Sequence, residues 1–311
     1  MARLRLRAQL LQRVRTFFTT RAALEVETPL LISAAVSDVN LASAAVALDA
    51  STRTMFLQTS PEYAMKRLLA AGSGDIWQLC KVVRGNESGP LHNPEFSLLE
   101  WYRIATGMAQ IAAETCELLA ELLGAGAAKV TSERYVALFN RYLALDPLSA
   151  DRATLEQALG PARLGATALA SLSRDQLLDA IMGLVIGPQL GFEGLQIVSH
   201  YPASQAALAQ LDPADPALAE RFEIYYRGVE LANGFCELGD ATEQRTRFET
   251  DNLERQRRGL PVVALDEALL AALAHGLPAC SGVAVGFDRI VMLASAAARL
   301  GDVISFTTER A

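Results

Sequence analysis

The stretch Cys280-Ser281-Gly282-Val283-Ala284-Val285-Gly286-Phe287-Asp288-Arg289 decides the fold of this chain. It predicts a glycine-rich strand that turns into a helix near Phe287. Small residues let a backbone approach a ligand closely, and an arginine at the start of a helix can reach a polyphosphate. Glycine before a helix is common, so this stretch alone identifies nothing. Its meaning depends on what precedes it in the chain.

Two earlier segments supply that context: Glu25-Val26-Glu27-Thr28-Pro29, and Arg84 followed by His92-Asn93-Pro94-Glu95-Phe96. In this order the three segments resemble the signature motifs of class II aminoacyl-tRNA synthetases, over a span from about residue 8 to the C-terminus. Further residues favour the lysyl branch, and within it the elongation factor P lysine lysyltransferases. The resemblance implies an α+β fold with a mainly antiparallel β-sheet flanked by helices. It also implies a homodimer, for which Leu10, Val14, Phe17 and Phe18 offer an apolar stripe; the alternative for part of this stripe is that it faces the core of the same chain.

Composition is consistent with a reduced cytoplasmic protein. The chain has 311 residues, half of them apolar, which is enough for a substantial core. No apolar run reaches the roughly 18 residues that a membrane helix needs, so no membrane partner is expected. The four cysteines are scattered without a C-x-x-C pair, and the three histidines lie far apart. A disulfide scaffold and a histidine-based metal site are therefore disfavoured.

The net charge of −7 argues against tRNA as the partner, because phosphate neutralisation supplies most of the affinity for nucleic acid. A local basic patch stays possible. One candidate cluster is Arg3, Arg5, Arg7, Arg13 and Arg15, and another is Arg245, Arg247, Arg255, Arg257 and Arg258. For both clusters a solvated helix face is the simpler interpretation.

Hydrophobic spacing predicts hairpin-connected strands with helices packed against them. Helices are expected at 3–23, 61–69, 108–123, 242–259 and 265–275, and strands at 25–27, 54–58, 76–83, 96–104, 194–200 and 221–236. Ser60 is the expected N-cap of the second helix, with Pro61 as its first residue. Residues 130–190 are rich in Ala and Leu, and we interpret them as a helical insertion. The expectation is a single catalytic domain over 1–311. It lacks the anticodon-binding domain of lysyl-tRNA synthetases, since the first motif begins within about 25 residues of the start.

The resemblance implies ATP-dependent adenylate formation, in which the protein positions two anions and stabilises charge on phosphorus. Arg84 would bridge the substrate carboxylate and the α-phosphate, Arg289 would hold the γ-phosphate, and Phe96 would stack on adenine. The implied ATP contacts are Arg84, Gly85, Asn86, Asn93, Phe96, Glu230, Leu231, Gly286 and Arg289. The chain departs from the family at Asn86, where a glutamate is usual, so either Asn86 or Glu87 would contact adenine.

Magnesium would accompany ATP, because Mg²⁺ binds through a few carboxylates and phosphate oxygens. Glu223 and Glu230 match the metal-binding pair of the family. Their separation of seven residues would send them to opposite faces of one flat strand. Gly228 lies between them and permits a turn that could bring them together. Spacing alone predicts that both are solvated charges, whereas the resemblance implies that they are metal ligands.

The amino-acid pocket carries the evidence for the lysyl branch. Glu237 and Tyr102 would bind the side-chain ammonium, and Glu100 and Glu62 the other amine, since a buried ammonium needs carboxylate or neutral oxygens. An acidic surface patch is the competing interpretation, although Phe235 and Trp101 suggest burial. The implied substrate contacts are Ser60, Pro61, Glu62, Glu100, Tyr102, Asn233, Phe235, Glu237 and Ala284.

Ala284 and Ser60 separate this chain from true lysyl-tRNA synthetases. Those enzymes read Gly-x-Gly-x-Gly before the Asp-Arg pair, and Ala284 replaces the middle glycine. One methyl group changes discrimination by ~1–3 kcal/mol, enough to disfavour α-lysine against an isomer with its amine moved. The resembled family prefers (R)-β-lysine and transfers it to a lysine ε-amine of translation elongation factor P. The alternatives are a truncated lysyl-tRNA synthetase that charges a tRNA, or a non-catalytic synthetase-like regulatory subunit.

Overall fold

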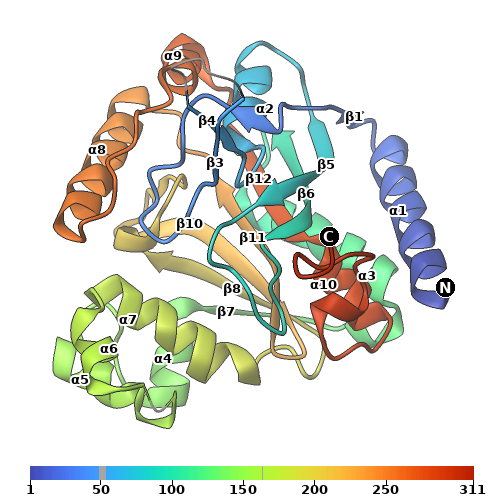
Figure 1. Cartoon of the computed structure of the whole chain (residues 1–311). Coiled ribbons are helices and arrows are strands. Elements are labelled where there is room, and N and C mark those ends of the chain that lie inside the picture. The colour runs from blue at the N-terminus through green and yellow to red at the C-terminus, as the bar shows by residue number, and fades with distance from the viewer. Residues whose placement is uncertain (49–53, 163) are drawn as a thin grey trace. The chain divides into compact units, whose positions relative to one another are not determined.

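The computed structural model describes residues 1–48, 54–162 and 164–311. The chain divides into two compact units, one made of Met1–Gly107 with Glu237–Ala311 and the other of Met108–Cys236. The first unit therefore contains both ends of the chain, coloured blue and red in Figure 1. All three signature segments belong to it. Each unit is α+β, with mostly antiparallel strands, as the sequence predicts.

The first unit is built on strands in the order β1-β5-β6-β12, in which β5, β6 and β12 are antiparallel and β1 is parallel to β5. The predicted 76–104 hairpin is thereby confirmed. A smaller sheet has the order β2-β4-β3. The strands are β1 Leu24–Glu25, β2 Leu31–Ile32, β3 Ala45–Val46, β4 Met55–Leu57, β5 Ile76–Val83, β6 Glu95–Ile104 and β12 Cys280–Gly286. The helices are α1 Ala2–Thr20, α2 Glu62–Ala70, α8 Ala241–Arg257, α9 Glu267–Gly276, α10 Phe287–Ala294 and the 3₁₀ turn η6 Leu300–Asp302.

The apolar stripe of α1 packs into the core of the first unit. Leu10, Val14, Phe17 and Phe18 are all buried within the chain. The Phe18 ring stacks on Trp77 with centroids 4.9 Å apart and meets the edge of Trp101 at 5.2 Å. The expectation that this stripe forms a subunit interface is therefore wrong, because aromatic rings of the same chain already cover it.

Strand register places three polar residues of β5 and β6, Gln78, Glu100 and Tyr102, on one face of the sheet. Gln78, Glu100 and Ala284 are directly opposite one another, and the next row is Ile76, Tyr102 and Gly282. Cross-strand partners share a face, and residues two apart along a strand share it as well. The glycine-rich strand therefore lies beside Glu100 and Tyr102, as its predicted role requires.

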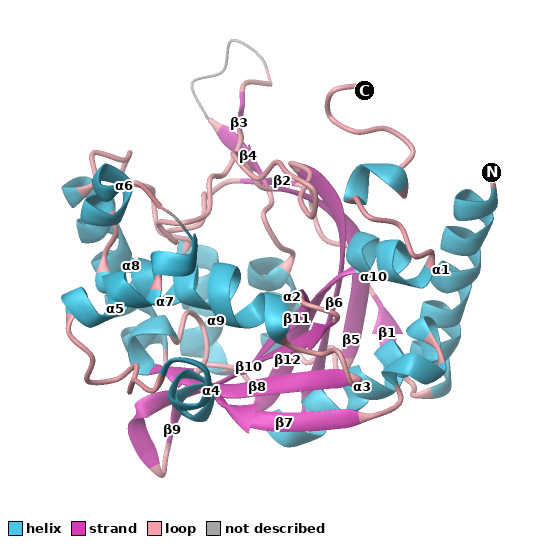
Figure 2. Cartoon of the chain, turned by 90° about the horizontal axis from the view of Figure 1, so that it is seen from below, coloured by secondary structure: helices cyan, strands magenta, loops and turns pink. Residues whose placement is uncertain are grey.

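The second unit has the strand order β11-β10-β8-β7, with β9 paired to β10. Helices α4 and α7 pack their apolar sides, including Tyr135, Phe139 and Leu177, against Val198, Tyr201 and Tyr225 of the strands, and Figure 2 shows α4 against β7 and β8. The strands are β7 Val130–Arg134, β8 Leu195–Pro202, β9 Leu211–Asp212, β10 Asp215–Tyr226 and β11 Val229–Cys236. The helices are α3 Met108–Leu123, η1 Ala125–Ala127, α4 Tyr135–Leu143, α5 Arg152–Ala158, η2 Gly160–Ala162, α6 Ala166–Ser171, α7 Arg174–Ile181, the π-helical turn η3 Met182–Ile186, η4 Gly187–Gln189 and η5 Ala203–Gln205.

Strand β7 departs from the prediction of helix throughout 130–190. Val130–Arg134 runs parallel to β8, with Val130 opposite Leu195 and Arg134 opposite Ser199. Only five residues are involved before α4 begins, and β-branched Val130 and Thr131 favour a strand. The rest of the segment is mainly helical, as expected. Among the described helices, none combines the length and apolar character needed to cross a bilayer.

Candidate active site

Glu100 is the centre of a buried carboxylate cluster in the first unit. Its side chain comes from the middle of β6, and the residue is 2% exposed. The Tyr102 hydroxyl donates to Glu100 Oε1 at 2.6 Å, and the Ser60 hydroxyl donates to Oε2 at 3.0 Å. Burial, and next the charge of Glu62, raise the pKa of Glu100 to about 8. In the free protein this carboxyl therefore keeps its proton near neutral pH, and a positive charge brought beside it would lower its pKa.

Ser60 and Pro61 place the start of α2 beside this carboxylate. Ser60 Oγ accepts a hydrogen bond from the Glu62 backbone N–H at 3.0 Å, and the helix begins at Glu62 with Pro61 as its cap residue. The helix thus starts one residue later than a Ser60 N-cap predicts. Ser60 still satisfies a backbone donor of the first turn, and it orients Glu100 with its own hydrogen.

Lys66, a residue that the sequence analysis missed, pairs with two of the predicted pocket carboxylates. Its Nζ lies 2.6 Å from Glu237 Oε2 and 2.8 Å from Glu62 Oε1, and the lysine is 1% exposed. Burial alone would lower the pKa of Lys66, but the two carboxylates outweigh it and raise that pKa. Burial raises the pKa of Glu237 to about 7, against the opposing effect of Lys66. A signal existed: Glu62 and Lys66 share a helix face with apolar Met65 and Leu69.

Gly282 is the glycine of β12 whose missing side chain shapes this pocket. A Cβ placed there would lie 2.3 Å from Tyr102 Cε1 and 2.5 Å from Glu237 Oε1. The glycine therefore allows the side chains of Tyr102 and Glu237 to pack directly against the backbone of β12. Ala284, two residues on, is partly buried and lies opposite Glu100. Its methyl group borders the same face.

Arg84 follows β5 and is held by its neighbours. Its Nε donates to the Thr59 carbonyl at 3.2 Å, its guanidinium carbon lies 5.2 Å from the centroid of the Phe96 ring, and Nη1 is 4.0 Å from Glu87 Oε1. Thr59 and Ser60 are adjacent, so one short segment contacts both Arg84 and Glu100. The structure thus joins the predicted phosphate-binding arginine to the amino-acid pocket.

The loop after Arg84 explains part of the departure from the family pattern. Asn86 has a φ of +63°, a left-handed conformation that asparagine adopts more readily than most residues. Asn86 is exposed, whereas Glu87 faces Arg84. Gly85 packs tightly, because its N–H donates to Ala42 O at 2.8 Å and a Cβ would lie 3.1 Å from the Ala42 methyl.

Arg289 lies in the first turn of α10, three residues after Gly286, as predicted. Its Nη2 donates to His92 Nε2 at 2.8 Å, and its Nε donates weakly to Leu91 O at 3.4 Å. Partial burial and the Arg289 charge lower the pKa of His92, which favours the neutral imidazole that accepts this bond. His92, an unassigned residue of the second motif, therefore orients the arginine.

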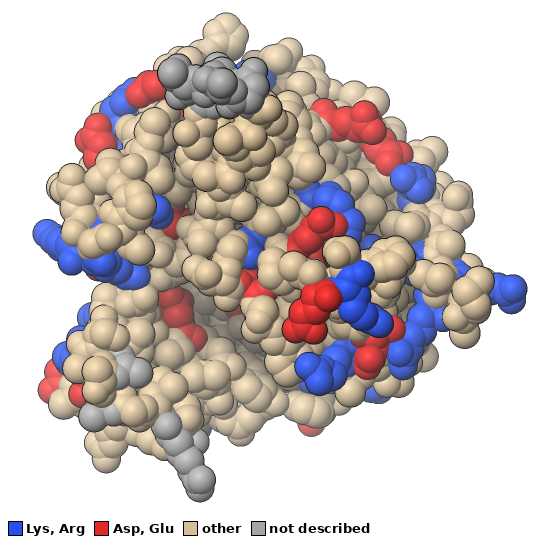
Figure 3. Space-filling view, in the orientation of Figure 1, with Lys and Arg blue, Asp and Glu red and all other residues tan. Residues whose placement is uncertain are grey.

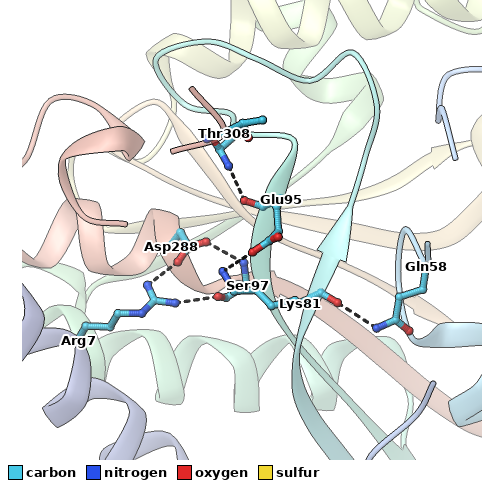
Figure 4. A network of polar contacts seen from close by, with 8 residues as sticks. Arg7, Gln58, Lys81, Glu95, Ser97, Asp288 and Thr308 are labelled. Atoms are coloured by element: carbon cyan, nitrogen blue, oxygen red, sulfur yellow. Dashed lines mark hydrogen bonds and ion pairs between the residues drawn. The ribbon is translucent and has the colours of Figure 1, made fainter. Parts of the chain in front are cut away.

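A second network fixes α10 against β6 and α1 (Figure 4). Buried Asp288 accepts the Ser97 backbone N–H at 2.7 Å and also pairs with Arg7, whose Nη2 donates to Ser97 Oγ at 2.7 Å. Nearby, Asn93 donates to Glu95 O at 2.6 Å and accepts from the Thr308 backbone and hydroxyl at 3.3 Å. Asn93 thus ties the C-terminal segment to the loop predicted to bind ATP.

Four further predicted residues share one face of the β10–β11 hairpin in the second unit: Glu223, Glu230, Asn233 and Phe235. Arg227 and Gly228, at φ +50° and +75°, form its two-residue turn, as the position of Gly228 predicts. Glu223 is opposite Asn233, Arg221 is opposite Phe235, and Tyr225 is opposite Glu230. A register shift after Ile224 leaves Leu231 as the extra residue, with Leu231 buried. The turn therefore places Glu223 and Glu230 on one face, as the metal hypothesis requires.

Glu223 and Glu230 would supply carboxylate oxygens to Mg²⁺, but they do not make a complete set of ligands by themselves. Glu223 Oε1 accepts from Arg221 at 2.6 Å and Oε2 accepts from Tyr225 at 2.6 Å, so this carboxylate is rigidly held. Within the described residues, no group of three or more His, Cys, Asp or Glu side chains is arranged to hold a metal ion. A cation here would need further oxygens from a ligand, as Mg²⁺ sites at phosphates do.

The two arginine clusters are mostly used in contacts within the chain. Arg245 pairs with Glu267 at 2.6 Å, Arg258 with Glu254 at 2.9 Å, and Arg15 with Glu25 at 3.3 Å. Figure 3 shows basic and acidic side chains interspersed on the face in view, with basic atoms gathered near α8. Ion pairs within the chain thus occupy several of these arginines.

Comparison with known proteins places the whole chain in one family. Residues 1–310 match the model of the tRNA synthetases class II (D, K and N), so the chain belongs to that family. Within it, similar curated proteins are named elongation factor P--(R)-beta-lysine ligase. Those of Sodalis glossinidius and Pectobacterium carotovorum are each 48% identical over 309 residues, covering 98% of this chain and 94% of the relative. That of Klebsiella pneumoniae is 47% identical with the same coverage.

Proposed function

We propose that this protein is an ATP-dependent ligase that activates (R)-β-lysine, and α-lysine less well, and transfers it to a lysine ε-amine of elongation factor P. The names of the relatives supply the substrate and the acceptor. The structural observation that carries the proposal is the buried pocket of Glu62, Glu100 and Glu237. Such a pocket suits a substrate with two ammonium groups, since buried carboxylates need cationic partners.

The first half-reaction forms an adenylate. The substrate carboxylate attacks the α-phosphorus of ATP, a P–O bond forms, and pyrophosphate leaves. Arg84 would bridge the carboxylate and the α-phosphate, with Thr59 O and Phe96 fixing its guanidinium before substrate arrives. Preorganised cations of this kind stabilise charge that develops in the transition state. Arg289, oriented by His92, would bind the γ-phosphate.

The second half-reaction forms an amide. The neutral ε-amine of the acceptor lysine attacks the carbonyl carbon of the adenylate, AMP leaves with the electron pair of the broken C–O bond, and the amine loses a proton. This chain contributes mainly the position of the activated lysine. Glu237 and Tyr102 would hold one ammonium and Glu100 with Glu62 the other, as the sequence predicts.

The metal and assembly belong to the same proposal. Glu223 and Glu230 would hold Mg²⁺, which neutralises phosphate charge when it is bound with ATP. We also propose that the chain acts in the cytoplasm as a homodimer, and that residues 1–311 form one catalytic domain with the mainly helical 130–190 segment as an insertion. Asn233, Phe235, Leu231 and Gly286 are proposed substrate or ATP contacts.

Mass spectrometry of the acceptor tests the function. Elongation factor P is incubated with this protein, ATP and either lysine isomer, and bulk tRNA replaces it in a parallel reaction. The expected result is one lysyl addition to elongation factor P, faster with (R)-β-lysine, together with pyrophosphate exchange that depends on the amino acid. Arg84→Ala should abolish the addition. Charging of tRNA with elongation factor P unmodified would favour the truncated synthetase, and the absence of exchange with either isomer would favour a non-catalytic protein.

A further inference from the structure

Lys66 is a buried cation among the acidic residues of the pocket. It is the one lysine of three in this sequence that is buried; Lys81 and Lys129 form exposed ion pairs with Glu95 and Glu193. The chain uses arginine for nearly all its other cations. A compact ammonium with three donors fits between two carboxylates where a planar guanidinium needs more room.

We propose that Lys66 is a positioning residue that sets the charge of the amino-acid pocket. The pocket has three carboxyl groups, those of Glu62, Glu100 and Glu237, and the Lys66 ammonium pairs with Glu62 and Glu237. With all three carboxyls ionised, two formal negative charges remain. A diamino acid supplies two ammonium groups and so matches this remainder. The inference rests on the proposed function, because it assumes that the pocket binds such an amino acid.

The contacts show how Lys66 acts through its neighbours. It holds Glu237 by Oε2, while Oε1 lies over Gly282 and beside Tyr102, so one oxygen is anchored and the other faces the glycine-rich strand. The same ammonium holds Glu62 at the first turn of α2. Glu100 instead receives its hydrogen bonds from two uncharged hydroxyls, those of Tyr102 and Ser60. Glu62 and Glu237 are thus already paired with a cation, whereas Glu100 is hydrogen-bonded to neutral hydroxyls.

Removing the ammonium should disturb binding in a way that depends on pH. With Lys66→Met, buried Glu237 loses its resident cation, and its carboxyl, like that of Glu100, holds its proton more strongly. An incoming ammonium must then displace those protons, and this becomes easier as the pH rises. The groups that face Lys66 and its partners are Glu62 and Tyr63 of α2, Glu100 and Tyr102 of β6, Cys80 of β5, and Glu237.

The test measures KM for (R)-β-lysine and for ATP by pyrophosphate exchange between about pH 7 and about pH 9, for the wild type and three variants. Lys66→Met should raise the amino-acid KM by about tenfold or more at the lower pH, and the ratio to wild type should shrink as pH rises, with the ATP KM little changed. Lys66→Met with Glu62→Gln removes one charge of each sign, so at the lower pH its amino-acid KM should be lower than that of Lys66→Met alone. Lys129→Met, at the exposed pair, is the matched control and should change nothing.

The outcomes separate this inference from the function on which it rests. A wild-type protein without exchange activity contradicts the proposed function. An active wild type with an unchanged KM in Lys66→Met, or a raised KM with the same ratio at every pH, overturns the role of Lys66 and leaves the function intact. If Lys66→Met does not fold, the double variant decides, because it keeps the formal charge of the pocket: it must fold and show measurable exchange with the amino acid, and failure of either also overturns the inference.

Discussion

At the scale of single residues, Gly282 and Ala284 have different roles, although the glycine-rich sequence predicts one role for both. Gly282 makes room for Tyr102 and Glu237 of the same chain, while Ala284 borders Glu100 where a substrate would lie. Close approach of backbone to ligand is therefore only part of the reason for small residues here. The other part is internal packing of the pocket.

Gly282→Ala should damage the pocket by overpacking. The added methyl would collide with a ring carbon and a carboxylate oxygen that are both buried, so we expect a loss of stability of ~1–3 kcal/mol and a raised amino-acid KM. Thermal denaturation and exchange kinetics measure both. Gly183→Ala is the control, because a Cβ there meets nothing within 4 Å. Equal behaviour of the two variants would show that β12 shifts freely.

Ala284→Gly should move the preference from β-lysine toward α-lysine. Removing the methyl opposite Glu100 frees space on the pocket face, and one methyl is worth ~1–3 kcal/mol of discrimination. The ratio of kcat/KM for the two isomers, from pyrophosphate exchange, measures this. Ala217→Gly, an exposed position in β10, controls for the general effect of glycine in a strand. An unchanged ratio would direct attention to Ser60.

Glu100 should make the free protein less stable as pH rises. Its pKa is about 8 in the folded state and about 4.3 in an unfolded chain. The folded state keeps a proton that the unfolded state releases, so stability is fully present below about pH 4 and is lost as pH rises toward about 8. Glu100→Gln removes this dependence. Melting temperatures measured across that range without amino acid should fall more steeply for wild type, and parallel curves would contradict the assignment.

Lys66 shows where prediction from residues reached its limit. The carboxylates Glu62, Glu100 and Glu237 followed from the resemblance, and the structure brings them together around one buried site. Their roles toward substrate stay predictions. The lysine between them was overlooked because a charged helix residue is usually solvated. Its burial depends on Glu237, which is remote in sequence.

At the scale of elements, local pattern predicted most helices and strands but not the contacts that place them. The hairpin of β5 and β6, the turn at Gly228, and helices α3, α8 and α9 follow from spacing and turn residues. Strand β7 does not, because its five residues precede a long helical segment and owe their conformation to pairing with β8. Val130 and Thr131 favour a strand locally, but the pairing with β8 is a tertiary contact that local sequence does not encode.

Arg7→Met should show that α1 is anchored through α10. Arg7 pairs with buried Asp288 and with Ser97, and removing one partner of a buried ion pair costs ~3–5 kcal/mol. Arg15→Met on the same helix is the control, since its pair with Glu25 is exposed and worth about 0–1 kcal/mol. Urea denaturation measures both. A small loss in Arg7→Met would mean that the Ser97 N–H alone satisfies Asp288.

At the scale of the whole molecule, the resemblance predicted the family and the α+β class, and both are confirmed by a match over residues 1–310. It was wrong about the apolar stripe of α1, which the core of the first unit takes up. Helical periodicity shows that a face is buried but does not show against what. Subunit association therefore has to be tested through other residues.

If the protein is a homodimer that associates through its first motif, exposed apolar residues around that motif should stabilise the pair. Leu24 is 56% exposed and Leu30 is 44% exposed, and β1 lies at one end of the strand order in its unit. Burying such side chains between subunits removes apolar area from water. Sedimentation velocity at micromolar concentration should give a dimer for wild type and a monomer for Leu24→Asp with Leu30→Asp.

The control for that measurement is Leu184→Asp. Leu184 is 52% exposed and belongs to the second unit, far from the motif in sequence. Leu184→Asp should leave the dimer intact, because this exposed leucine lies outside the expected interface. A wild-type protein that sediments as a monomer would contradict the dimer itself. A dimer that survives the paired substitution but not Leu184→Asp would place the interface on the second unit instead.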